Sequence, residues 1–124
     1  MIKFVIIHNK SGKVHVRRWY VSLDVTEKRE IEELLFQFTA TTIYGKEQNI
    51  QYIGNKKFAY KKYASLYFWF CIDEEHNDLL AIESIHAFVE HLNSIFDRVK
   101  ELNFYYDFHR IYSTLDGFID SIGT

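Results

Sequence analysis

The sequence predicts a single α+β domain, in which a five-stranded, antiparallel-type sheet carries helices on its faces. Three observations support this fold class: short β-branched and aromatic runs in the first 72 residues, one helical apolar stripe among them, and two helical stripes near the end of the chain. A length of 124 residues corresponds to about one domain, and 48% hydrophobic residues are sufficient to form a core. The expected order of elements is ββαβββαα.

The first two strands are predicted at residues 2–8 and 13–20, where β-branched and aromatic residues are concentrated. The polar segment between them is typical of a hairpin turn, so the two strands should be antiparallel neighbours. Regular alternation would place Val14 and Val16 on one face of the second strand. The other face would then carry His15, Arg17 and Trp19.

A helix is predicted to follow Asp24 and to end near residue 40. Asp24 stands three residues before Glu27, which is the spacing of a capping box. Apolar residues then recur at helical intervals, at Ile31, Leu34, Leu35 and Phe38. The threonines that follow lower the helix propensity, so the helix should end there.

Three more strands are predicted at 48–53, 57–62 and 64–72. The last of them is apolar on both faces, which indicates a strand covered from both sides or central in the sheet. Two helices should close the chain, because apolar residues recur every three or four positions from 82 to 99 and again from 104 to 118.

Composition restricts the function of the protein. A formal net charge of −2 argues against a protein that holds nucleic acid through its overall field. The lone cysteine, Cys71, cannot form an internal disulfide, which favours a reducing compartment. The apolar run at the N-terminus is too short for a signal peptide or a membrane span, so we expect a soluble, cytosolic protein.

No catalytic, metal or cofactor site is predicted. Gly12-Lys13 lacks the other residues of a phosphate-binding loop. Glu83 and His86 form half of a carboxylate-bridged metal motif without its second copy, and the acidic segment 73–78 lacks the spacing of a calcium loop. Cys71 lies in the most apolar strand, where a thiol is usually inert.

Basic residues are concentrated in the first half of the sequence, on or beside the predicted strands. They fit two interpretations, an anion-binding surface or ordinary exposed strand faces whose charges protect the sheet edges. The residues are Lys10, Lys13, Arg17, Arg18, Lys56, Lys57, Lys61 and Lys62.

One motif resembles a known family. Tyr60 and Lys61, followed after four positions by Leu66-Tyr67-Phe68, match the signature of the small (sigma) subunits of clathrin adaptor complexes, whose fold is longin-like. The MIKF start, Trp19-Tyr20, IHAFVEHLN at 85–93 and KELNFYYDFHRIY at 100–112 also resemble this family, in the same order along the chain. Phe58 and Ala59 depart from it, because an aliphatic pair is usual there.

The resemblance implies a non-enzymatic small subunit of a clathrin adaptor complex in vesicle-mediated protein transport. Its partners would be large adaptin subunits, and it would be cytoplasmic and peripheral on Golgi, endosomal or plasma-membrane coated vesicles. Ser65 is more typical of the trans-Golgi and endosomal type than of the plasma-membrane type. Residues 1–124 would form one domain that lacks the family's final helix. The alternative is a small subunit of coatomer or another longin-domain trafficking protein.

The resemblance also implies a pocket for cargo tails that carry an acidic dileucine signal. By position, the pocket would use Ala64, Leu66, Val89, Val99 and Leu102, with Arg98 where the family usually has asparagine. His15 aligns with the basic residue that meets the acidic part of the signal, and Arg17 and Arg18 would add charge nearby. Without the resemblance, the aliphatic members of this set would be interpreted as core.

Overall fold

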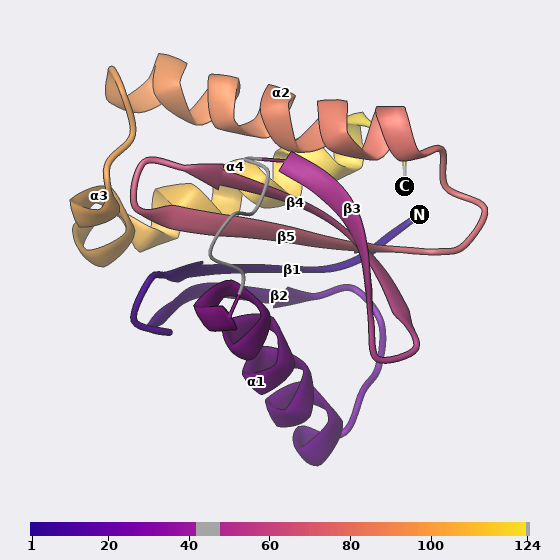
Figure 1. Ribbon diagram of the computed structural model, residues 1–124. Helices are drawn as coiled ribbons and strands as arrows, with labels where there is room; N and C mark the ends of the chain where they lie inside the picture. Colours follow the sequence, from indigo (N-terminus) through magenta and orange to yellow (C-terminus); the bar gives the residue numbers. More distant parts are fainter. Residues whose placement is uncertain (42–47, 124) are drawn as a thin grey trace.

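The computed structural model describes residues 1–41 and 48–123 of the chain (Figure 1). It confirms the predicted fold class, because an antiparallel five-stranded sheet carries helices on both faces. The strands are β1 (Ile2–Asn9), β2 (Val14–Trp19), β3 (Gln48–Ile53), β4 (Lys56–Tyr63) and β5 (Leu66–Ile72). The helices are α1 (Val25–Thr41), α2 (Asp78–Phe96), α3 (Glu101–Tyr106) and α4 (Phe108–Ser121).

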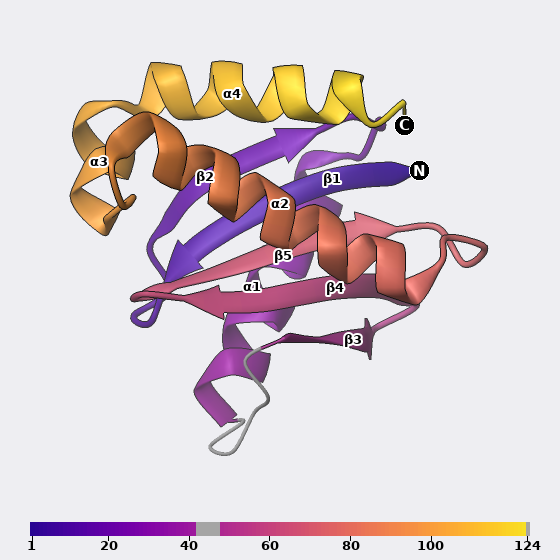
Figure 2. The same ribbon diagram turned by 90° about the horizontal axis from the view of Figure 1, so that it is seen from above.

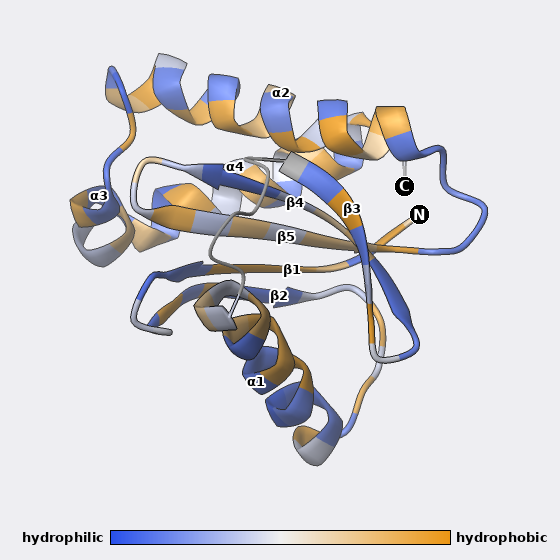
Figure 3. Ribbon diagram, viewed as in Figure 1, coloured by the Kyte–Doolittle hydropathy of each residue, from blue (hydrophilic) through white to orange (hydrophobic). Residues whose placement is uncertain are grey.

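The strands lie in the order β2-β1-β5-β4-β3, so β5 is the middle strand and pairs with β1 and β4. Its side chains are buried on both faces, as the sequence predicted. Phe68 and Phe70 contribute to one core cluster, and Trp69 and Cys71 contribute to the other. Figure 3 shows the same property, because β5 is hydrophobic along most of its length whereas α1 and α2 alternate in hydropathy.

The two faces of the sheet are covered by different helices. α1 packs on one face, and α2 and α4 lie side by side on the other, with α3 at the end of the sheet (Figures 1 and 2). Ile31 and Leu35 of α1 are buried against Phe58 and Trp69 in the smaller cluster. Burial of these apolar stripes is the main favourable contribution to the fold.

A β-bulge changes which face of β2 each residue occupies. Ile7 pairs with Val16, but His8 pairs with Val14, so β2 has one extra residue at this point. Val16 therefore lies in the cluster under α2 and α4, whereas Val14 and Trp19 pack on the α1 side. The prediction that Val14 and Val16 share a face was wrong, because regular alternation cannot reveal an inserted residue.

The helix ends explain where the chain changes direction. Asp24 Oδ1 accepts a hydrogen bond from Glu27 N at 2.7 Å, which confirms the predicted N-terminal cap of α1. Asn77 caps α2 in the same way, by accepting from Leu80 N at 3.0 Å. The final predicted helix is instead two helices, because the backbone at Asp107 (φ −117°, ψ 29°) separates α3 from α4. Among the described residues, no helix has the length and hydropathy needed to cross a bilayer.

Candidate functional site

The residues predicted for the cargo pocket fall into a buried group and an exposed group. Leu66, Val89 and Val99 belong to the core cluster under α2, and their exposed fractions are only 1%, 2% and 2%. Ala64, Arg98 and Leu102 lie on the surface. Ala64 is in the β4–β5 turn with φ +55°, so the prediction that it belongs to the last strand was wrong. The predicted pocket is thus a closed apolar floor beside an exposed rim.

Asn93 fixes the segment that follows α2. Its Oδ1 accepts from Val99 N at 2.8 Å, and its Nδ2 donates to Tyr63 Oη at 3.0 Å. Its backbone carbonyl accepts from Arg98 N at 3.2 Å. Asp97 and Arg98 both have positive φ, of 51° and 81°, a region that non-glycine residues rarely adopt. Asn93 therefore joins α2, β4 and the turn that presents Arg98.

Glu101, the first residue of α3, connects three segments that are distant in the sequence. It accepts hydrogen bonds from Asn9 Nδ2 at 2.9 Å and from Ser65 Oγ at 3.1 Å. Its Oε2 lies 2.7 Å from His15 Nε2, and the rings of His15 and Tyr105 pack in a T-shaped arrangement, with a centroid separation of 4.6 Å. The hydrogen bonds from His15, Asn9 and Ser65 hold the pKa of Glu101 below its usual value. Glu101 thus attaches α3 to the end of the sheet.

The three predicted cationic residues of the rim do not form a single surface. The side chain of His15 is only 3% exposed, because it is covered where it meets α3. Arg17 forms two hydrogen bonds to Glu32 of α1, at 2.7 and 3.0 Å, on the opposite face of the sheet. Arg18 binds Asp116 of α4 through two nitrogens. These hydrogen bonds raise the pKa of both guanidinium groups, and each cation already has a carboxylate partner.

Helix α3 and the first residue of α4 expose large apolar side chains next to the predicted rim. The group consists of Leu102, Tyr105, Tyr106 and Phe108, with exposed fractions of 61%, 48%, 81% and 44%. We call these four residues the α3 patch. Large exposed apolar groups that adjoin one another are typical of a surface that contacts another molecule.

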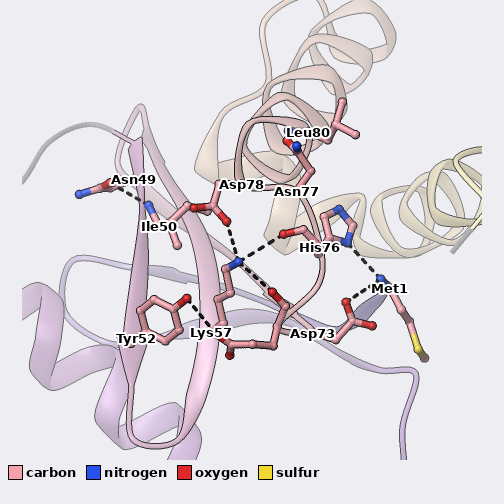
Figure 4. A network of polar contacts seen from close by, with 11 residues as sticks. Met1, Asn49, Ile50, Tyr52, Lys57, Asp73, His76, Asn77, Asp78 and Leu80 are labelled. Atoms are coloured by element: carbon pink, nitrogen blue, oxygen red, sulfur yellow. Dashed lines mark hydrogen bonds and ion pairs between the residues drawn. The ribbon is translucent and has the colours of Figure 1, made fainter.

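Lys57 belongs to the basic set of the first half of the chain, but its side chain is buried and has a structural role (Figure 4). It is 6% exposed, and its Nζ lies 2.6 Å from Asp78 Oδ1. The same nitrogen donates to the backbone carbonyls of His76 and Glu74, at 3.2 and 3.4 Å. The hydrogen bond to Asp78 raises the pKa of Lys57. Lys57 therefore fastens β4 to the β5–α2 loop, and it is not part of an anion-binding surface.

The partial motifs have structural explanations. Gly12 adopts φ +92° in the predicted hairpin turn, where Asn9 Oδ1 accepts from Lys13 N at 2.9 Å. In the partial metal motif, His86 Nε2 lies 3.6 Å from Oε1 of Glu90, four residues further along α2. Burial raises the pKa of Cys71 to about 11, so it remains a thiol. Within residues 1–41 and 48–123, no cluster of three histidine, cysteine or acidic residues has a metal-binding arrangement.

Comparison with known proteins identifies the family. The profile of the family described as clathrin adaptor complex small chain matches residues 1–124. The AP-2 complex subunit sigma of Schizosaccharomyces pombe is 37% identical over 119 residues, which are 96% of this chain and 83% of that protein. The AP-1 complex subunit sigma-3 of Homo sapiens is 33% identical over 119 residues, or 96% of this chain and 77% of that protein.

A solved structure shares the fold. It is described as a homology model of the full-length AP-3 complex in a stretched open conformation, and the TM-score is 0.72 at 23% sequence identity. The similarity covers 94% of this chain and 79% of that chain. The family profile and the two relatives identify the family, and the solved structure shows that the fold is the same. The chain therefore belongs to the clathrin adaptor complex small-chain family.

Proposed function

We propose that this chain is the non-enzymatic small subunit of a heterotetrameric adaptor complex, in which it stabilises the trunk of a large adaptin subunit. The observation that carries the proposal is the family match over residues 1–124, together with relatives named as sigma subunits of AP-2 and AP-1 complexes. Through such a complex the chain would act on the cytoplasmic side of Golgi, endosomal or plasma-membrane coated vesicles. The comparisons include sigma subunits of both complex types, so the type favoured by Ser65 remains a prediction.

The α3 patch supports an assembled state. Its side chains are large and exposed, and apolar residues of this kind are enriched in the centres of protein interfaces. We therefore expect the large subunit to cover the aromatic members of the α3 patch, Tyr105, Tyr106 and Phe108, and to leave Leu102 open at the rim of the proposed cargo site. The most exposed member, Tyr106, is the best residue to alter because it is 81% exposed and its replacement leaves the core intact.

Purification of the tagged full-length chain from native lysate, followed by mass spectrometry, tests the assembly. Large adaptin subunits should co-purify in stoichiometric amounts, and Tyr106→Asp should reduce their recovery at least about tenfold because it places a charge in an apolar contact. Leu79→Asp is the matched control, since Leu79 is exposed on α2, away from the α3 patch. Recovery of the chain without large subunits would overturn the assembly, and full recovery with Tyr106→Asp would exclude the patch as the contact.

We also propose that the end of the sheet near Arg98 binds cargo tails with an acidic dileucine signal. Two leucines buried against the floor of Leu66, Val89 and Val99 would each contribute roughly 1.5–3 kcal/mol. Because this floor is closed in the isolated chain, binding requires it to open, and the affinity should be weak, in the micromolar range.

The acidic part of the signal would compete with carboxylates of this chain for the predicted cationic residues. His15, Arg17 and Arg18 already contact Glu101, Glu32 and Asp116. Of the four cationic residues predicted for this site, the exposed Arg98 is the one that the signal can reach without displacing a carboxylate, since Arg98 has no ion pair within the described part of the chain. The charge attraction should be salt-sensitive.

Titration of a fluorescent dileucine peptide against the assembled complex tests cargo binding. Leu102→Ser should weaken binding about tenfold, because Leu102 is an exposed residue of the rim. Leu80→Ser, which alters an exposed leucine at the start of α2, is the matched control. Val89→Asp is a poor test, because Val89 is core and the charge would unfold the domain. Equal affinity for a dialanine peptide would rule out the pocket while leaving the assembly proposal intact.

A further inference from the structure

A cavity of about 330 Å³ lies on the α1 side of the sheet, between α1 and the β3–β4 hairpin. It is on the opposite face from the proposed cargo site. Its apolar wall is formed by Ile31, Leu34 and Leu35 from α1 and by Ile53 and Phe58 from the hairpin. Leu34 is 42% exposed, so apolar surface at this cavity remains open to solvent. The volume lies within the range of sites that bind small molecules or side chains.

The cavity continues along α1. A second hollow of about 230 Å³ is lined by Glu30, Glu33, Leu34 and Gln37, and it shares Glu30 and Leu34 with the first. Two adjoining hollows on either side of one leucine form a groove along a helix. A groove of this kind suits a peptide segment that inserts two side chains, as when one amphipathic helix packs against another.

The edge of this groove is acidic. Lys56 Nζ lies 3.6 Å from Glu27, so the charges of these two residues offset each other. In the part of the chain that the structure describes, neither Glu30 nor Glu33 forms an ion pair or a side-chain hydrogen bond. A partner segment with cationic side chains beside its apolar residues would complement this edge, and an acidic segment would be repelled.

We propose that this groove docks an amphipathic segment of a partner protein, which inserts two aliphatic side chains and places lysine or arginine against Glu30 and Glu33. The site has the opposite charge preference from an acidic dileucine site. It therefore does not depend on the cargo proposal, and the failure of one does not imply failure of the other. Occupation of both faces is possible at once, because the sheet separates the two sites.

Binding of two designed peptides to the full-length chain tests the proposal. The first is a capped helical peptide of about 14 residues with two leucines one helical turn apart and arginines beside them. The second is its twin with glutamate in place of each arginine. Methyl NMR of the chain should show shifts at Leu34 and Ile53 with the first peptide, and the twin should bind at least about tenfold more weakly.

Matched variants locate the site and its charge preference. Leu34→Ser should weaken binding of the arginine peptide about tenfold, whereas Leu79→Ser on α2 should leave binding unchanged. Both leucines are exposed, so both variants should keep the fold. Glu30→Lys should abolish the preference between the twins, because the lysine offsets the charge of Glu33, and Glu83→Lys, a change at an exposed glutamate of α2, should leave it unchanged. Equal affinities of the twins, shifts confined to α3, or no binding of the arginine peptide up to about 1 mM would each overturn the proposal.

Discussion

Replacing Glu101 with alanine tests how α3 is held to the end of the sheet. The carboxylate is hydrogen-bonded to Asn9, His15 and Ser65, so its removal leaves three side chains without this partner. His15 is the most affected, because its side chain is 3% exposed and water cannot readily replace the carboxylate. A buried polar group that loses its partner costs about 1–3 kcal/mol.

The other two losses should be smaller. Asn9 keeps the hydrogen bonds that its Oδ1 accepts from Ser11 N and Lys13 N, and Ser65 is exposed to water. We assign about 0.5 kcal/mol to each of them, near the lower limit for a typical hydrogen bond. Glu101→Ala should therefore lower the free energy of unfolding by about 2–4 kcal/mol, a large part of the stability of a small domain.

Urea denaturation of the purified chain measures this loss as a lower midpoint with an unchanged slope. The folded-state pKa of Glu101 lies below its ordinary value of 4.5, so the unfolded chain binds the proton more readily. The stabilisation is then complete above about pH 4.5 and is lost as the pH falls through the lowered pKa. The difference between the two proteins should shrink on acidification. A loss below about 0.5 kcal/mol, or a difference that grows below pH 4.5, would refute this account.

Two further predictions concern the α1 side of the sheet and the first hairpin. His8→Leu removes the acceptor of the Trp69 Nε1 hydrogen bond (3.1 Å) and should lower the free energy of unfolding by about 1–3 kcal/mol in urea titrations. Because burial lowers the pKa of His8, its contribution is complete above about pH 6.5 and is lost as the pH falls. The stability of the variant should thus decline less steeply below pH 6.5, and an unchanged decline would contradict this role. Gly12→Ala should lower the melting temperature, because Gly12 has φ +92° and a Cβ there would lie 2.9 Å from Phe36 Cδ1. Gly117→Ala is its control in α4, where nothing lies within 4 Å of an added Cβ; it should raise the melting temperature, and a similar response from both variants would contradict the steric argument.

The fold was predictable where a local pattern determines the structure. Asp24 and Glu27 lie at the spacing of a helix start, and their hydrogen bond forms as predicted. The last strand is apolar on both faces because it has neighbours on both sides and helices above and below. Patterns of this kind depend on residues close together in the sequence, so they can be recognised without knowledge of the tertiary structure.

The candidate site was less predictable, because contacts between distant segments determine it. The bulge at His15 turns this side chain towards α3 and leaves Arg17 on the other face. In a regular strand, two residues separated by two positions would lie on the same face. In the sequence Lys57 resembles the other basic residues of the first half of the chain, but the fold places two carbonyl groups of the β5–α2 loop and Asp78 of α2 around it. The roles of Asn93 and Glu101 likewise arise only when α2, α3 and the strand turns meet.

The position of β1 in the sheet has a consequence for the synthesis of the protein. The strand β1 is synthesised before β2 and β5, and it pairs with both of them, although β5 ends only at Ile72. Until β5 has been made, the nascent β1–β2 hairpin has an open edge at a strand whose residues Phe4, Val5, Ile6 and Ile7 all end up in the core. Open apolar edges favour association between chains, and sheets that need distant pairings form slowly. A nascent chain that has not yet reached Ile72 thus lacks the complete strand that closes this edge, and protection by chaperones is most needed during that interval.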